Sequence, residues 1–126
     1  MVTLWSIARS PLFLGADLTH MDPFTAALVT NPEVIAVDQH SIKNHALLSE
    51  GDTTIWTAAS PDGAHQFLAI FNLSDSQHSI SYSWRKLGLP SGSHPVRDLW
   101  KQQNLQPVDQ LTVVLPPHGS ALYRIQ

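Results

Sequence analysis

The chain has 126 residues and a net charge of −3 at pH 7, a length that accommodates one domain, or one small domain and a piece of another. Its seven lysines and arginines are spread from Arg9 to Arg124 without forming a cluster, so we expect no nucleic-acid partner. The absence of cysteine excludes disulfides and thiolate chemistry, and no apolar run reaches the length of a membrane span, so we expect no membrane partner. Only 13% of the residues are charged, against about 25% in typical domains, which indicates that further protein covers part of the surface. The first residues lack the basic segment of a signal peptide, and the cellular compartment is left open.

The first third of the chain has the pattern of helices around a buried strand. One helical face is formed by Leu4, Trp5, Ile7 and Ala8. A continuous apolar run over residues 12–16 predicts a strand of a parallel, helix-covered sheet. Asp22-Pro23 and Asn31-Pro32 each place a side-chain acceptor before a proline, and they predict helices over 23–29 and 32–37. Residues 1–43 hold too few strands to close a sheet, so we interpret them as part of a larger α/β structure.

From about residue 44 to residue 126 the pattern is all-β. Ile80, Tyr82 and Trp84 alternate with serines, which predicts a strand with one apolar face. The nearly continuous apolar run over 66–71 predicts a central strand. About six strands are predicted in total, over residues 53–58, 66–71, 79–84, 96–100, 111–115 and 121–125. Short strands separated by proline and glycine turns are typical of an antiparallel sandwich or barrel.

Seven histidines raise the question of a metal site. They are His20, His40, His45, His65, His78, His94 and His118. No two have the three- or four-residue spacing of a helical zinc motif, and the chain has no cysteine to pair with them. We therefore predict no metal ligand and no cofactor.

Carboxylates are the next candidates for chemistry, because glycosidases and other acid–base enzymes use them in pairs. Asp17 directly follows the strand predicted over 12–16, and in a (β/α) barrel that end of a strand faces the active site. Asp17 is therefore either an acid of a catalytic site or a turn cap, and the lack of a partner acid favours the cap. Asp22 is interpreted as a helix N-cap and Glu33 as a first-turn acid that stabilises the helix dipole. No residue is assigned to catalysis or substrate binding.

Four aromatic residues on predicted strands allow an alternative function. They are Trp56, Tyr82, Trp84 and Trp100. Gathered on one face, they would form a flat platform for stacking on sugars, as in carbohydrate-binding sandwich modules. The apolar alternation around them favours core packing instead, because aromatic residues are strong strand formers. Core packing is the leading interpretation, and a carbohydrate-binding module is the alternative.

Several motifs, taken together, resemble one enzyme family. They are the segment Leu4–Leu18; Met21-Asp22 with Leu28; the segment Thr30–Gln39 with its Asn-Pro-Glu-Val run; Val96–Trp100; and Pro116–Arg124. The first three resemble the last barrel strand and final barrel helix of family 27 glycoside hydrolases, which are the α-galactosidases (melibiases) and α-N-acetylgalactosaminidases. The other two resemble late strands of that family's C-terminal β-sandwich. The resemblance covers essentially the whole chain.

The resemblance implies a mixed fold in two parts. Residues 1–43 would be the last helix, strand and helix of a (β/α)8 barrel, and residues 44–126 an antiparallel, Greek-key-like β-sandwich. Asp17 matches an aspartate near the top of the last barrel strand, with a structural role.

The resemblance also implies a parent reaction, the retaining hydrolysis of terminal α-galactosides by two aspartates. Those aspartates belong to motifs that this chain lacks, so no catalytic residue is carried over. We expect a structural, non-catalytic C-terminal fragment whose partner is the rest of the barrel, from the same gene or from a separately encoded chain. An α-galactoside would be contacted only through that barrel.

Overall fold

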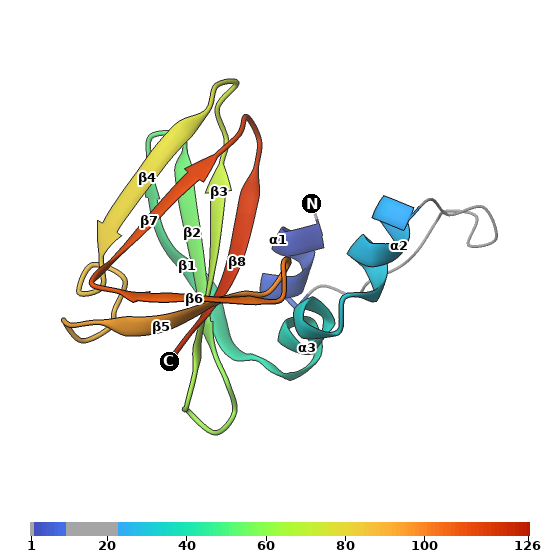
Figure 1. The fold of residues 1–126 in the computed structure, drawn as a ribbon, viewed down its shortest axis with the longest axis horizontal. Coiled ribbons are helices and arrows are strands. Elements are labelled where there is room, and N and C mark those ends of the chain that lie inside the picture. The colour runs from blue at the N-terminus through green and yellow to red at the C-terminus, as the bar shows by residue number, and fades with distance from the viewer. Residues whose placement is uncertain (1, 10–22) are drawn as a thin grey trace.

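The computed structural model describes residues 2–9 and 23–126, and it shows three short helices beside a two-layer β-sandwich (Figure 1). The helices are α1 (Val2–Ile7), α2 (Pro23–Thr30) and α3 (Pro32–His40). The strands are β1 (Ile42–Glu50), β2 (Thr53–Ala59), β3 (Gln66–Asn72), β4 (His78–Ser83), β5 (His94–Asp98), β6 (Gln103–Val108), β7 (Gln110–Leu115) and β8 (Ser120–Ile125). Helices α2 and α3 begin at the predicted prolines, and the strand expected over 12–16 lies outside the described residues.

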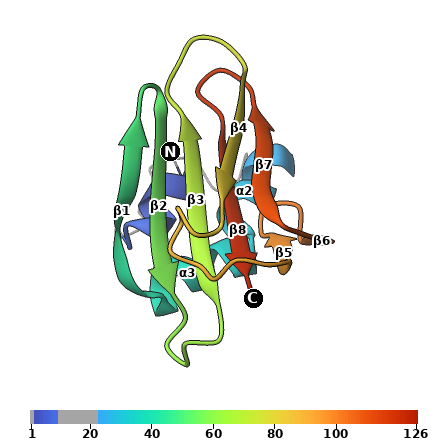
Figure 2. The same ribbon diagram turned by 90° about the vertical axis from the view of Figure 1, so that its left-hand side faces the viewer.

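The strands form two antiparallel sheets. Six strands make the larger sheet in the order β1-β2-β3-β8-β5-β6, and β4 pairs with β7 in the smaller one. The chain leaves the larger sheet after β3 and again after β6, and each time it returns. Figure 2 shows β4 and β7 in front of the larger sheet and the helices behind it. The antiparallel sandwich predicted from the residue pattern is confirmed, with β3 in the interior of its sheet.

The prediction of about six strands was wrong by two, because β1 and β6 were missed. Both are edge strands of the larger sheet and carry mostly exposed residues. Strand β1 pairs with β2 through two register irregularities, which break the alternation of apolar and polar residues. Strand β6 contains Pro107, which a sheet tolerates at an edge because proline cannot donate to the ladder. Neither strand therefore has the sequence pattern of a half-buried strand.

The central strands of the larger sheet are buried on both faces. We call the face toward β4 and β7 the inner face, and the face toward the helices the outer face. The inner core consists of Ile55, Leu68, Ile70, Ile80, Trp84, Leu87, Val96, Leu111, Leu115, Ala121, Tyr123 and Ile125. Full burial of such a side chain contributes about 1.5–3 kcal/mol relative to its exposure, so this core dominates the stability of the sandwich.

One margin of the sandwich is closed by polar groups that bridge the two sheets. Glu50 ends β1, and its carboxylate accepts a hydrogen bond from the Tyr82 hydroxyl of β4 at 3.1 Å. The Lys86 ammonium forms an ion pair with Glu50 at 2.7 Å and lies 5.1 Å from the centre of the Tyr82 ring. These three side chains hold the β1 edge against the smaller sheet.

Candidate functional site

The outer face carries a second apolar cluster, which joins the helices to the sandwich. Its buried members are Ile7, Val34, Val37, Ala58, Ala69, Leu99 and Leu122, with Trp56, Phe67, Phe71 and Trp100 partly buried around them. Alternation along β2, β3 and β8 produces this cluster, because residues next to inner-core side chains point to the opposite face. We call this contact of α1 and α3 with the outer face the joint. Figure 1 shows both helices against this side of the sheet.

Asn31 is the polar centre of the joint. Its side-chain oxygen caps α3 by accepting from the backbone N–H groups of Glu33 at 3.0 Å and Val34 at 3.2 Å. Its amide nitrogen donates to the carbonyl oxygens of Leu99 at 2.9 Å and Trp100 at 3.3 Å. Sequence analysis identified the cap, which depends on local spacing. It missed the two donated bonds, because they join residues 68 and 69 positions apart.

An ion pair fixes the same end of α3 to β5. The guanidinium of Arg97 binds Glu33 in a two-pronged arrangement, with Nη2–Oε1 at 2.6 Å and Nε–Oε2 at 2.9 Å. Arg97 also donates to the Asn104 side chain of β6 at 3.0 Å. Hydrogen bonding to Arg97 lowers the pKa of Glu33, against a smaller opposite effect of partial burial. Glu33 thus binds the sandwich, in addition to lying in the first helical turn as the sequence predicted.

Helix α1 is held by residues from the far end of the chain. The buried Thr3 hydroxyl accepts hydrogen bonds from the Trp100 indole and the Ser120 hydroxyl, both at 2.9 Å. The Asn44 amide donates to the backbone oxygen of Ile7 at 2.7 Å. The joint therefore orients α1 by directional hydrogen bonds as well as by apolar contact.

The carboxylates predicted as candidates are either far from one another or outside the residues that the structure describes. Asp17 and Asp22 are outside the described residues. A hydrogen bond from Lys86 is the largest cause of the lowered pKa of Glu50, and a hydrogen bond from Ser60 is the largest cause of the lowered pKa of Asp62. Arg97 has the same effect on Glu33. Burial raises the pKa of Asp38, whose backbone oxygen accepts from Arg9. Over residues 2–9 and 23–126, no hydrogen bond or ion pair joins two carboxyl groups.

The histidines are likewise separated. His94 packs edge-on against Trp84 with ring centres 5.5 Å apart, and His118 pairs with Asp75 at 2.7 Å. In the described part of the chain, no group of three histidine, aspartate or glutamate side chains could hold a metal ion. None of the helices that the structure describes is long and apolar enough to span a membrane.

The four aromatic residues do not form a platform. Trp84 is buried in the inner core, where its indole donates to the Val108 carbonyl oxygen at 2.8 Å, and Tyr82 packs against the same core. Trp56 and Trp100 belong to the opposite, outer face. The alternative prediction of a shared sugar-stacking surface was therefore wrong, because the two pairs lie on different sides of the larger sheet.

The fold and the joint define a β-sandwich domain with a helical segment fixed to one sheet face. Residues 50–125 match the family described as the alpha galactosidase C-terminal beta sandwich domain. The chain therefore belongs to this family of C-terminal domains of α-galactosidase-like proteins.

Similar proteins extend this likeness over the helical segment. An α-galactosidase of Coffea arabica is 32% identical over 96% of the chain, and α-galactosidase 2 of Arabidopsis thaliana is 33% identical over 98%. Among solved structures, a GH27 β-L-arabinopyranosidase from Geobacillus stearothermophilus covers 100% of the chain with a TM-score of 0.94 and 37% identity. The chain spans about a third of these relatives, namely 33%, 32% and 29%. The resemblance to the C-terminal portion of family 27 enzymes is confirmed.

Proposed function

We propose that this chain is the structural, non-catalytic C-terminal part of a family 27 glycoside hydrolase, and that it holds the end of a (β/α)8 barrel against a β-sandwich. The joint carries this proposal. In it, Asn31 binds the turn after β5, Glu33 binds β5 and Thr3 binds β8, each through its side chain. A helical segment fixed in this way would transmit the rigidity of the sandwich to the barrel to which residues 1–43 belong.

The carboxylates support a non-catalytic role. Retaining glycosidases need two carboxyl groups about 5–5.5 Å apart, with one of them kept protonated as the acid. Among the described residues, Glu33, Glu50 and Asp62 have lowered pKa values and are bound to partners, whereas a catalytic acid must stay protonated. Burial raises the pKa of Asp38, but no hydrogen bond or ion pair in the described part of the chain joins it to a second carboxyl group. We infer that the parent reaction, hydrolysis of terminal α-galactosides, uses acids of the barrel and that the sugar is contacted there.

A chimera tests this role directly. This chain would replace the corresponding third of the Geobacillus relative, and the product would be assayed with chromogenic α-D-galactopyranoside and β-L-arabinopyranoside, the sugars that the relatives' names suggest. We expect an active chimera, and no activity from the isolated chain. A matched chimera with Asn31→Ala should melt at a lower temperature, and one with Val114→Thr should not.

Two results would contradict the proposal. Turnover of either glycoside by the purified chain alone would show that it contains its own catalytic acids. A chimera whose barrel is folded but whose melting temperature is no higher than that of the truncated barrel would show that the sandwich does not stabilise the barrel. Adding the chain to a separately produced barrel portion would test the related possibility that the two work as separate subunits.

A further inference from the structure

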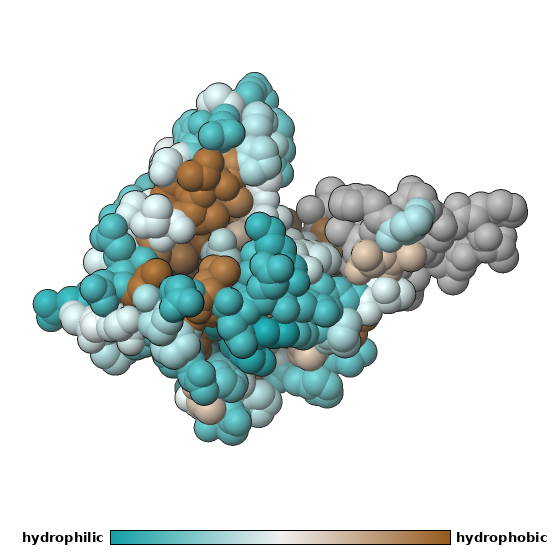
Figure 3. Space-filling model, in the orientation of Figure 1, coloured by the Kyte–Doolittle hydropathy of each residue, from teal (hydrophilic) through white to brown (hydrophobic). Residues whose placement is uncertain are grey.

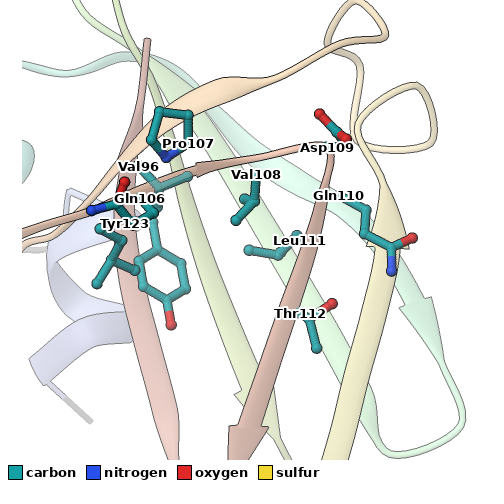
Figure 4. Close-up of a pocket in the computed structure, with 10 residues that line it drawn as sticks. Val96, Gln106, Pro107, Val108, Asp109, Gln110, Leu111, Thr112 and Tyr123 are labelled. Atoms are coloured by element: carbon teal, nitrogen blue, oxygen red, sulfur yellow. The ribbon is translucent and has the colours of Figure 1, made fainter.

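A cavity of about 320 Å³ lies on the inner side of the sandwich, between the β5–β6 hairpin and β7. Its apolar walls include Val96, Leu105, Val108 and Leu111, with Tyr123 beside them. The rest of the lining is formed by Pro107 and the polar residues Gln106, Asp109, Gln110 and Thr112. Figure 4 shows Val108 and Leu111 directed into the space beside the Tyr123 ring, whereas the polar ends of Asp109 and Gln110 turn away from it. The volume is within the range of small-molecule sites, which are typically concave and largely apolar.

Tyr123 supplies the polar group of this cavity. The residue is 6% exposed and lines the cavity, and no hydrogen bond joins its hydroxyl to another described residue. The hydroxyl oxygen keeps some exposure to the cavity, so it is a donor that a bound molecule can reach. Burial, with a smaller effect of Asp98, raises the pKa of Tyr123 to about 12, so the hydroxyl keeps its proton at neutral pH. A hydroxyl beside largely aliphatic walls is a group to which a ligand with one acceptor would bind.

The cavity wall is preformed and accessible. The indole of Trp84 donates to the Val108 carbonyl oxygen at 2.8 Å, which fixes the end of β6 at the cavity. Leu105 and Val108 on the rim are 43% and 38% exposed, and Figure 3 shows hydrophobic surface gathered on this side of the sandwich. The helices that the structure describes cover the opposite face of the larger sheet, and none of their residues lines the cavity.

We propose that this cavity binds a small uncharged ligand with a compact apolar body and a single hydrogen-bond acceptor, such as an aryl ketone. Val96, Leu105, Val108 and Leu111 would enclose the body, and the Tyr123 hydroxyl would donate to the acceptor. A free sugar fits less well, because Val96, Leu105, Val108 and Leu111 offer no partner to its several hydroxyls and the polar ends of Asp109 and Gln110 turn away from the space. No lysine, arginine or histidine lines the cavity, so the site offers nothing to an anion.

Acetophenone is a suitable probe, because it combines a phenyl ring with one carbonyl acceptor. It would be titrated into the methyl-labelled 126-residue chain, with the resonances of Val96, Leu105, Val108 and Leu111 as the readout. We expect saturable shifts confined to these residues. Tyr123→Phe should weaken binding roughly five- to tenfold, the effect of losing one hydrogen bond. Ethylbenzene, which lacks the acceptor, should bind equally to both forms.

Rim variants provide the controls. Leu105→Glu places a charge at the exposed rim and should abolish the saturable shifts, whereas Val114→Glu, exposed on β7 but outside the cavity, should leave the affinity unchanged. Amide spectra would verify that each variant is folded. If Tyr123→Phe does not fold, the Leu105→Glu variant tests the proposal. Absent or non-saturable shifts, an unchanged affinity in Leu105→Glu, or displacement of acetophenone by galactose would overturn the proposal.

Discussion

The two faces of the larger sheet are both buried, but they are covered by different means. The inner face is closed by a second sheet through aliphatic side chains and Trp84, whose indole forms one hydrogen bond to a backbone oxygen. The outer face is covered by two short helices, and there a smaller apolar cluster is surrounded by side-chain hydrogen bonds and an ion pair. Apolar contact provides most of the stability on the inner face, whereas directional contacts on the outer face also set the orientation of the helices.

The hydrogen bonds of the outer covering join the two ends of the chain. The hydrogen bond between Thr3 and Ser120 joins residues 117 positions apart, and the pair Arg97–Glu33 spans 64. The outer face is therefore completed only when the helical segment meets strands from the other end of the chain. This comparison predicts that changes to the inner face unfold the whole domain, whereas changes to the joint loosen the helices first.

The largest effect is expected from Trp84→Ala on the inner face. Trp84 is almost fully buried, and its removal leaves a large cavity and an unpaired Val108 carbonyl oxygen. We expect a loss of about 3–5 kcal/mol in the free energy of unfolding. Urea denaturation followed by far-ultraviolet circular dichroism would measure it. A loss below about 1 kcal/mol would mean that the inner core does not dominate stability.

A smaller and local effect is expected from Asn31→Ala in the joint. The change removes a helix cap and the donors to the Leu99 and Trp100 carbonyl oxygens, at a cost of roughly 1–3 kcal/mol. Amide hydrogen exchange should become faster in α3 while β3 keeps its protection. Asn31→Asp keeps the cap but not the donors, so its exchange rate in α3 should lie between those of the parent chain and Asn31→Ala. Equal acceleration in α3 and β3 would show that the two faces unfold together.

Acid should weaken the joint through Glu33. Because its pKa is lowered in the folded state from an ordinary value of 4.5, its ion pair with Arg97 stabilises the protein above that pH, and this contribution is lost as the pH falls through the folded pKa. Glu33→Gln should lower the melting temperature at pH 6, by less than Asn31→Ala does. The difference from the parent chain should shrink toward pH 3. A difference that is constant from pH 6 to pH 3 would argue against this ion pair.

The smallest effect is expected on the exposed side of the smaller sheet. Val114 is 56% exposed on β7 and belongs to neither apolar cluster. Val114→Thr keeps the β-branched shape favoured in strands, so the free energy of unfolding should change by no more than about 0.5 kcal/mol. The same urea titration would measure it. A larger loss would indicate that this side is covered in the folded chain.

Local patterns were sufficient for many of the elements. Helices α2 and α3 begin at the predicted prolines, and Asn31 caps α3 as predicted, because a cap depends only on neighbouring residues. Asp22 lies outside the described residues. Alternation identified β4, and a continuous apolar run placed β3 in the interior of its sheet. The edge strands β1 and β6 were missed, since an edge makes little demand on side-chain polarity.

The sequence by itself determined the all-β character of residues 44–126, the starts of two helices and the likeness to one family. Only the tertiary structure decided which face each aromatic residue occupies, what Asn31 and Glu33 bind across the joint, and that Tyr123 lines the cavity beside β7. The physical reason is the distance along the chain over which the deciding contacts act. Caps and alternation are set by residues within a few positions, whereas packing on either face of a sheet depends on which distant strands lie beside one another.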